Sequence, residues 1–418
     1  MKKAGVVLKS SVKFMAEFIR WTAIAAAIGC AGGLIGAAFH TAVSGANEFR
    51  SENSWLVFLL PLGGLLIVAL YKLASMLDNH GTDDIIDAVR GTKKLPFRTA
   101  PLIFVSTFIT HLFGGSAGRE GAALQLGGTV GYGAGRTFGL DIKDRHIAVM
   151  CGMSAVFSAL FGTPLTSVIF AIEVISVGVM YYSGLIPCLT SALAAYGVTR
   201  LFDIEPTHFV LRAVPEAGII PILQTLALAA LCAGLSVIFC IMLHGADKGL
   251  KKLIKNPFIR IAAGGLAIIA LTLLVRCGDY NGAGEQIIKN AVNGTAKPEA
   301  FALKMIFTAI TIGAGFKGGE IVPTFFVGAT FGCFAGGLIG LDPGFGAAVG
   351  MIAMFCGMLN CPVASVILSI EMFGEQGIVL FAVAAAVSYM LSGYYGLYHS
   401  QKIMYSKFRA EFINRKTH

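Results

Sequence analysis

The sequence predicts an all-α integral membrane protein with two related halves and many tilted and broken transmembrane helices. Three observations lead there. Of the 418 residues, 56% are hydrophobic and only 13% are charged, and the mean hydropathy is +0.76. Apolar segments follow one another from about Trp21 to Tyr395, and one pattern of residues occurs twice. This composition is typical of membrane proteins and exceeds that of a soluble core.

The apolar segments fall into two classes of length. A helix needs about 20 apolar residues to cross a bilayer, and the segments near that length are 21–43, 55–77, 219–243, 258–275 and 377–395. Shorter or glycine-broken segments lie at 101–113, 121–135, 146–160, 164–177, 305–313, 323–339 and 362–373. We expect the shorter ones to be half-helices. Broken helices are tolerated at membrane depth where their free ends face protein or a cavity, and in transporters they mark the binding site.

The two halves carry the same residues in the same order. Gly118-x-Glu120 is followed by glycines at 127, 131 and 135, and Gly319-x-Ile321 is followed by glycines at 328, 332 and 336, an offset of 201. The segment 163–173 matches 361–371 at an offset of 198. Such glycine ladders form small-residue faces on which helices pack closely. The repetition therefore predicts an internal duplication.

From this duplication we expect five parts. They are a cytoplasmic N-terminal segment (1–20), a first membrane repeat (21–245), a basic linker (246–258), a second membrane repeat (259–398) and a C-terminal helix or tail (399–418), with no regulatory domain and no removable signal peptide. The positive-inside rule would put the basic linker in the cytoplasm with the basic termini. Inverted halves with both termini inside require the opposite side. We follow the duplication and expect an external or interfacial linker.

Glu120 is the leading candidate for a functional residue. It stands in a glycine-rich run among apolar segments, where an acid costs roughly 2.5–3.5 kcal/mol on insertion scales. Glycines let the backbone approach a ligand, and their N–H groups can face an anion. When ionised, the carboxylate can occupy that anion site; when protonated, it can leave. The sequence therefore predicts a small-anion site with a proton-binding gate.

Other function classes fit the composition poorly. The net charge of +9 comes mainly from the chain ends and a few loops, which indicates membrane topology rather than nucleic-acid binding. The nine cysteines form no CxxC pair, so we expect small buried residues rather than disulfides or ligands. The eight histidines form no HExxH or triad-like spacing. We therefore expect neither an enzyme nor a cofactor or metal.

The motifs also resemble those of the CLC family of chloride channels and anion/proton antiporters. The residues are 118–121, the run 319–323 (with Ile321 where the family has Phe) and the late Tyr398. This resemblance implies a CLC-type inverted repeat and a homodimer with one pore per subunit. It implies that Glu120 is the gating and proton-coupling glutamate. The anion would be bound by the residues Gly118, Arg119, Gly121, Thr82, Ile321, Val322 and Tyr398, mostly through backbone N–H groups at helix N-termini.

Departures from the family pattern point to one branch. Ala122 stands where the chloride type has proline, and no G-S-G-x-P serine motif occurs; Thr82, within 78–86, is the candidate substitute. Val174 occupies the position of the internal proton-transfer glutamate. Together with 315–320, these features are similar to the bacterial F-type antiporters. The resemblance thus implies proton-coupled fluoride export across the cell membrane, in bacteria the plasma membrane. A chloride/proton antiporter and a passive chloride channel remain alternatives.

Several other polar residues have open roles. Glu173 and Glu371 end matched segments, and we expect them to be structural, each bonding a loop. Lys317 and Glu320 are expected to pair or to face a vestibule. A lone buried histidine such as His111 is more often structural than a proton relay. The remaining pair, Asp83 and Asp84, fits a vestibule mouth or a helix start.

Overall fold

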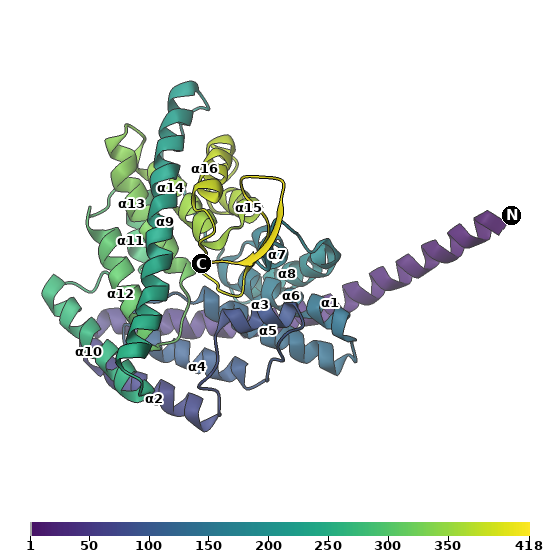
Figure 1. The fold of residues 1–418 in the computed structure, drawn as a ribbon, viewed down its shortest axis with the longest axis horizontal. Helices are drawn as coiled ribbons and strands as arrows, with labels where there is room; N and C mark the ends of the chain where they lie inside the picture. Colours follow the sequence, from purple (N-terminus) through teal and green to yellow (C-terminus); the bar gives the residue numbers. More distant parts are fainter. Residues whose placement is uncertain (1) are drawn as a thin grey trace.

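The computed structural model describes the backbone of residues 2–418 and the side chains of residues 11–418. Helices form most of it (Figure 1). Those of the first half are α1 (Lys2–Glu52), η1 (Ser54–Leu59), α2 (Leu60–Leu73), α3 (Thr82–Val89), α4 (Thr99–Leu112), α5 (Glu120–Thr137), α6 (Ile142–Phe161), α7 (Pro164–Glu173), η2 (Tyr182–Gly184) and α8 (Leu185–Arg200). Those of the second half are α9 (Ile219–Leu253), α10 (Pro257–Val275), α11 (Glu285–Val292), α12 (Ala300–Ala314), α13 (Ile321–Leu338), α14 (Pro343–Leu359), α15 (Pro362–Phe373) and α16 (Ile378–Leu391).

The second half repeats the order of the first. The helix pairs α4 and α12, α5 and α13, and α6 and α14 each begin 201 residues apart, and α7 and α15 begin 198 apart. These are the two offsets read from the motifs. The three-residue difference arises where α14 ends at Leu359, earlier in its repeat than α6 does in the first.

The glycine ladders bring paired helices into backbone contact. A Cβ added at Gly127 of α5 would collide with the carbonyl of Gly152 in α6. The twin contact joins Gly328 of α13 to Gly350 of α14. Because no side chain separates these backbones, α5 packs closely on α6, and α13 packs closely on α14. One glycine-rich loop (114–119) leads into α5, and the other (315–320) leads into α13.

Five helical segments are long and apolar enough to cross a membrane. They are Ser11–Glu52, Ser54–Leu73, Ile219–Leu253, Pro257–Val275 and Ile321–Leu338. Four of them match expected spans. The expected span 377–395 is wrong in length, because α16 starts after the left-handed Gly377 and ends before Ser392, giving 14 residues. Conversely, α13 is longer than the segment 323–339 suggested, since it starts at Ile321.

Three other boundaries differ from the expected parts. α1 continues without a break across position 20, and its first part projects from the body in Figure 1. Most of 246–258 is the last turns of α9 rather than a linker. The C-terminal segment is not a helix. It forms β2 (Lys402–Tyr405) and β3 (Phe412–Lys416), which pair antiparallel, while β2 pairs parallel with β1 (Ser176–Val177).

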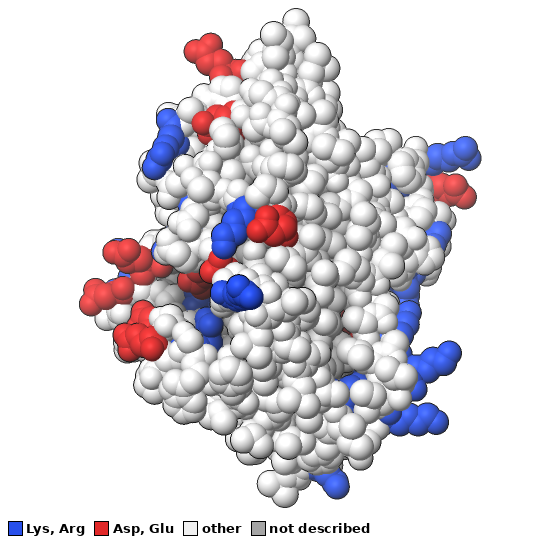
Figure 2. Space-filling view, turned by 90° about the vertical axis from the view of Figure 1, so that its left-hand side faces the viewer, with Lys and Arg blue, Asp and Glu red and all other residues white. Residues whose placement is uncertain are grey.

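The charged side chains are distributed as expected for a membrane-embedded surface. Figure 2 shows a broad uncharged band that separates a mainly basic margin from a mixed group of acidic and basic side chains. Many large apolar side chains are exposed on the helices, such as Leu62, Leu231 and Leu266. Exposing these side chains to lipid tails costs no free energy, whereas exposing them to water is unfavourable.

Candidate functional site

The two glycine-rich loops meet each other at the centre of the molecule. Gly118 N–H donates to the carbonyl of Gly319 at 2.6 Å, and Gly319 N–H donates to the carbonyl of Gly118 at 2.7 Å. The pair is an isolated antiparallel bridge. It fixes the starts of α5 and α13 beside each other, with the first residues Glu120 and Ile321 two positions after the bridge.

Buried polar side chains hold this bridge from behind. His111, fully buried in α4, has Nε2 at 3.2 Å from the Gly118 carbonyl and Nδ1 at 3.3 Å from Asn47 Oδ1. The Ser116 N–H donates to Thr311 Oγ1 at 3.1 Å, and Ser116 Oγ lies 3.1 Å from Thr308 Oγ1. The loop conformation is therefore fixed by both halves, and His111 contacts backbone rather than a carboxylate.

Glu120 is 1% exposed and folds back on the start of its own helix. Its Oε2 accepts the Arg119 backbone N–H at 2.9 Å. Gly118 is needed here because a Cβ at that position would collide with the same oxygen. The side chains of the N-cap residues Arg119 and Glu320 make no cap bond to α5 or α13, so within the described part of the chain the first N–H groups of both helices lack the usual side-chain acceptor.

The side chain of Arg119 lies between Glu120, the candidate gating residue, and Glu285 at the start of α11. Its Nε lies 3.9 Å from Glu120 Oε1, its Nη2 lies 3.3 Å from Glu285 Oε1, and its Nη1 donates to Ser44 Oγ at 3.0 Å. Most of its charge is thus directed away from Glu120, toward the half-exposed Glu285. The side chain of Arg119 is part of an ion pair, and only its backbone N–H reaches the carboxylate at hydrogen-bond distance.

Two cavities approach the junction, which is the place where the two glycine-rich loops meet. The first vestibule has a volume of about 290 Å³ and is lined by Tyr71, 79–83, Gln125, parts of α9, 314–318, Glu320 and 397–399. The second vestibule has a volume of about 1070 Å³ and is lined by parts of α1, η1, α10 and α11 with the loop 276–284. Glu120 lines neither cavity. The residues on either side of Glu120 reach both cavities, because Gly121 bonds Thr82 of the first vestibule and Arg119 pairs with Glu285 of the second.

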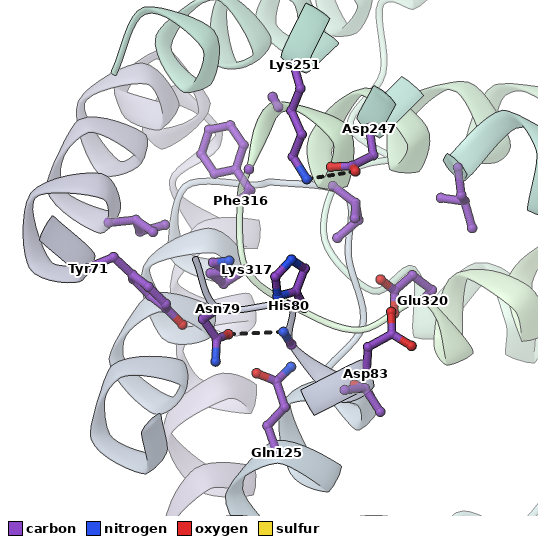
Figure 3. A pocket seen from close by; sticks show the side chains of 18 of the residues that line it. Tyr71, Asn79, His80, Asp83, Gln125, Asp247, Lys251, Phe316, Lys317 and Glu320 are labelled. Atoms are coloured by element: carbon purple, nitrogen blue, oxygen red, sulfur yellow. Dashed lines mark hydrogen bonds and ion pairs between the residues drawn. The ribbon is translucent and has the colours of Figure 1, made fainter. Parts of the chain in front are cut away.

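Thr82 and Tyr398 both line the first vestibule. The Thr82 hydroxyl donates to the Gly121 carbonyl at 3.3 Å, so this residue does lie beside the start of α5. Tyr398 is 4% exposed, and its hydroxyl has no hydrogen-bond partner among the described residues. Figure 3 shows the carboxylates of Asp83 and Glu320 facing each other in the same cavity.

The other expected residues lie close to the bridge. Ile321 and Val322 are buried in the first turn of α13. A Cβ at Gly121 would stand 3.0 Å from the Gly319 Cα and 3.4 Å from Glu320 Oε2. The glycines therefore allow the two helix starts to approach, and they bring all of the expected anion-site residues into one region.

Lys317 and Glu320, which could have paired or faced a vestibule, both line the first vestibule. They form no ion pair with each other within 4 Å among the described residues. The Lys317 ammonium instead lies 4.7 Å from the centre of the Tyr71 ring.

Two residues of the region were missed by the sequence reasoning. Gln125 lines the first vestibule, donates to the Gly121 carbonyl at 3.3 Å and leaves its Oε1 without a partner. Its place four residues after Gly121, on the same helix face, was a signal for it. Glu285 gave no such signal, since its contact with Arg119 joins residues that are far apart in the chain.

Glu173 and Glu371 are structural, as expected, and bond to each other's helix. Glu371 accepts the N–H groups of Leu165 and Thr166 at 2.9 and 2.8 Å. Glu173 accepts those of Val363 and Ala364 at 3.2 and 2.9 Å. Each carboxylate therefore caps the positive N-terminal end of the twin helix, and the reciprocity supports the duplication read from the sequence.

Comparisons with known proteins agree with this architecture. The family model described as voltage gated chloride channel matches residues 63–393. A chloride/fluoride channel protein of Pseudomonas syringae pv. tomato is 33% identical over 93% of this chain and 87% of its own length. An H(+)/Cl(-) exchange transporter of Vibrio campbellii is 24% identical over 85% and 82%. The crystal structure of a CLC-type fluoride/proton antiporter superposes with a TM-score of 0.89 at 29% identity, over 92% of this chain and 98% of that one.

Proposed function

Since the chain belongs to the CLC family of voltage-gated chloride channels, whose members move anions across membranes, we propose that it is a proton-coupled fluoride exporter gated by Glu120. The observation that carries this proposal is the position of Glu120. Its buried carboxylate accepts the Arg119 N–H at the start of α5, next to residues whose partners Thr82 and Glu285 line the first and the second vestibule. A site that binds a carboxylate through N–H groups can bind a small anion in its place.

Proton and anion movement are coupled because the ionised Glu120 carboxylate and the anion compete for the same site. An ionised Glu120 occupies the helix start and keeps the anion out. Protonation removes the charge that the N–H groups attract, so the side chain can leave and an anion can enter. Tyr398 and the backbone N–H groups at Arg119, Gly121, Ile321 and Val322 are the proposed anion ligands, with Thr82 holding the Gly121 carbonyl. Gly118, also expected as a ligand, instead donates its N–H to the Gly319 carbonyl and shapes the site. One proton bound at Glu120 and one anion at the junction then alternate.

A proton also has a route without a glutamate at position 174. Val174 is buried, and its carbonyl accepts Gln401 Nε2 at 2.9 Å. Glu320 lies beside Asp83 in Figure 3, and its Oε2 would stand 3.4 Å from a Cβ at Gly121, the residue that follows Glu120. Two carboxyl groups in the first vestibule, one of them near Glu120, favour antiport over the passive channel that Val174 alone would suggest.

The choice of fluoride rests on relatives and on sequence departures. Two of the similar proteins carry fluoride in their names, and one of these is a fluoride/proton antiporter. Ala122 follows the gate region where the chloride type has proline, and Thr82 stands in the serine region. Chloride/proton exchange is the second candidate, supported by the exchanger from Vibrio campbellii.

Ion fluxes from proteoliposomes test the proposal. Fluoride and chloride efflux are measured separately, with a pH electrode in the same cell. We expect fluoride efflux with opposite proton movement and little chloride flux. Chloride flux equal to or above fluoride flux would identify a chloride exchanger, and anion flux without proton movement would identify a channel.

The variant Glu120→Gln tests the gate. The amide cannot bind and release a proton, so we expect anion flux that has lost its coupling to protons, in a protein that still folds. Folding is checked by a single symmetric peak in size-exclusion chromatography. Proton movement at the wild-type ratio in this variant would contradict the role of Glu120.

We also propose a homodimer in the cell membrane, in bacteria the plasma membrane, because the CLC resemblance implies both. Light scattering of the detergent-purified protein, corrected for bound detergent, measures the mass. Twice the mass of one 43.9 kDa chain is expected, and the mass of a single chain at all concentrations would contradict the dimer.

A further inference from the structure

One cation of the first vestibule stands apart from the others. Lys251 pairs with Asp247 at 2.8 Å, and Arg260 donates to the carbonyls of Ala314 and Ile254. Lys317 lines the same cavity. Among the described residues, none offers its ammonium a carboxylate within 4 Å or a hydrogen-bond acceptor.

The Lys317 ammonium instead contacts an aromatic ring. Lys317 Nζ lies 4.7 Å from the centre of the Tyr71 ring, within the range of a cation–π contact. Tyr71, on α2, is 3% exposed, and its hydroxyl has no partner among the described residues. An ammonium with three donors and a phenol with one donor therefore line one wall of the cavity without acceptors.

The acidic side chains lie on the opposite side. In Figure 3, Tyr71 and Lys317 lie across the cavity from Asp83 and Glu320. Asp83 Oδ1 already accepts the Ser400 N–H at 2.7 Å, and Asp247 is held by Lys251. Gln125 Oε1, an acceptor without a partner in the same lining, forms no hydrogen bond with Lys317 or Tyr71 among the described residues, so the donors of both residues are left to face the cavity.

We propose that Lys317 and the Tyr71 hydroxyl form an anion-binding site in the first vestibule, separate from the junction at Glu120. The inference rests on the proposed transport function and adds a site that an anion occupies before or after it passes the junction. The Tyr71 hydroxyl is a buried donor without an acceptor, which is costly, whereas the partly exposed Lys317 lines the cavity with its charge unpaired by any carboxylate within 4 Å among the described residues. A bound anion would satisfy both donors at once, through hydrogen bonds that are strengthened by its charge.

The chemistry of the pair favours a compact anion. An ammonium is a compact, strongly hydrated charge, whereas a guanidinium is planar and more weakly hydrated. Compact ions of opposite sign pair best because each replaces the strong hydration of the other. A lysine with a phenol hydroxyl therefore suits fluoride better than chloride, and this site adds to selectivity rather than only to rate.

Two variants test the site by fluoride titration calorimetry on the purified protein and by fluoride KM in proteoliposomes. Tyr71→Phe keeps the ring and the cation–π contact and removes only the hydroxyl. We expect it to weaken fluoride binding by roughly ten- to a hundredfold, the usual size for one hydrogen bond to a charged group. Lys317→Met is expected to weaken it by more than tenfold, with a smaller effect on chloride.

Lys251→Met is the matched control. It removes one positive charge from the same vestibule, but from a half-exposed residue that is already paired, so we expect wild-type fluoride affinity. If Lys317 only packed against the ring, Tyr71→Phe would bind fluoride as the wild type does, and that result would overturn the inference even if Lys317→Met failed to fold. A failure of the proposed function is visible separately, as missing fluoride flux in the wild-type protein.

Discussion

Two buried hydroxyls without partners line the cavity through which the anion is proposed to pass. They belong to Tyr71 and Tyr398, and neither has a hydrogen-bond partner among the described residues. Each such atom costs about 1–3 kcal/mol when it is left unsatisfied. A fold keeps atoms of this kind at a functional site, because the ligand completes their bonding.

Tyr398→Phe should therefore separate stability from function. Removing a buried hydroxyl without a partner should leave the unfolding free energy unchanged or raise it by about 1 kcal/mol. The same change removes a proposed anion donor, so the KM for the transported anion should rise. Thermal denaturation in detergent and proteoliposome flux measure the two effects. A lower melting temperature with unchanged KM would mean that the hydroxyl is structural.

For single residues, the sequence was most informative where a residue type was unusual for its surroundings. Glu120 was predictable because an acid among glycines at membrane depth needs a reason. Thr82 followed from its position in the motif. Lys317 could not be resolved, since its pairing depends on whether Glu320 or Tyr71 comes near, and that is decided by tertiary structure. Gln125 was missed although its place four residues after Gly121 was a local signal.

The helices follow from local sequence more directly than the strands do. α7 and α15 each begin with a proline in the first turn and end near a glutamate, so their likeness and their ends could be read in advance. Their reciprocal caps then follow from two-fold repetition, because each carboxylate meets the N-terminus of the twin helix. Such capping is worth about 0.5–2 kcal/mol per helix end.

Elements that depend on distant partners were harder to predict. β2 exists because Lys402 and Ile403 pair with Ser176 and Val177 of the first half, more than 200 residues away. Neither the alternation in β2 nor that in β3 is strong enough to indicate a strand in a chain this apolar. The length of α16 was also overestimated, because apolar residues continue past the turn that ends the helix.

Besides the reciprocal helix caps and the Ser116 contacts, two buried places join the halves of the molecule. One is the bridge between Gly118 and Gly319. The other is Gln401, which is fully buried and whose Nε2 donates to the carbonyl of Val174 in the first half and of Leu359 in the second. Its backbone N–H also bonds the Tyr398 carbonyl at 3.0 Å. The C-terminal segment thus connects the halves and positions Tyr398.

Gln401→Leu should weaken both the fold and the anion site. Leucine fills a similar volume but makes no hydrogen bonds, so the Val174 carbonyl loses its side-chain donor, the Leu359 carbonyl keeps only the weak Cys361 thiol, and one Asn360 N–H loses the Gln401 Oε1 acceptor. Two unsatisfied buried groups should lower the unfolding free energy by roughly 2–6 kcal/mol, which thermal denaturation in detergent measures. Because Tyr398 is three residues away, the anion KM should rise as well. The same change at the exposed Gln376 is the control, and equal melting temperatures for the two variants would disprove the connecting role.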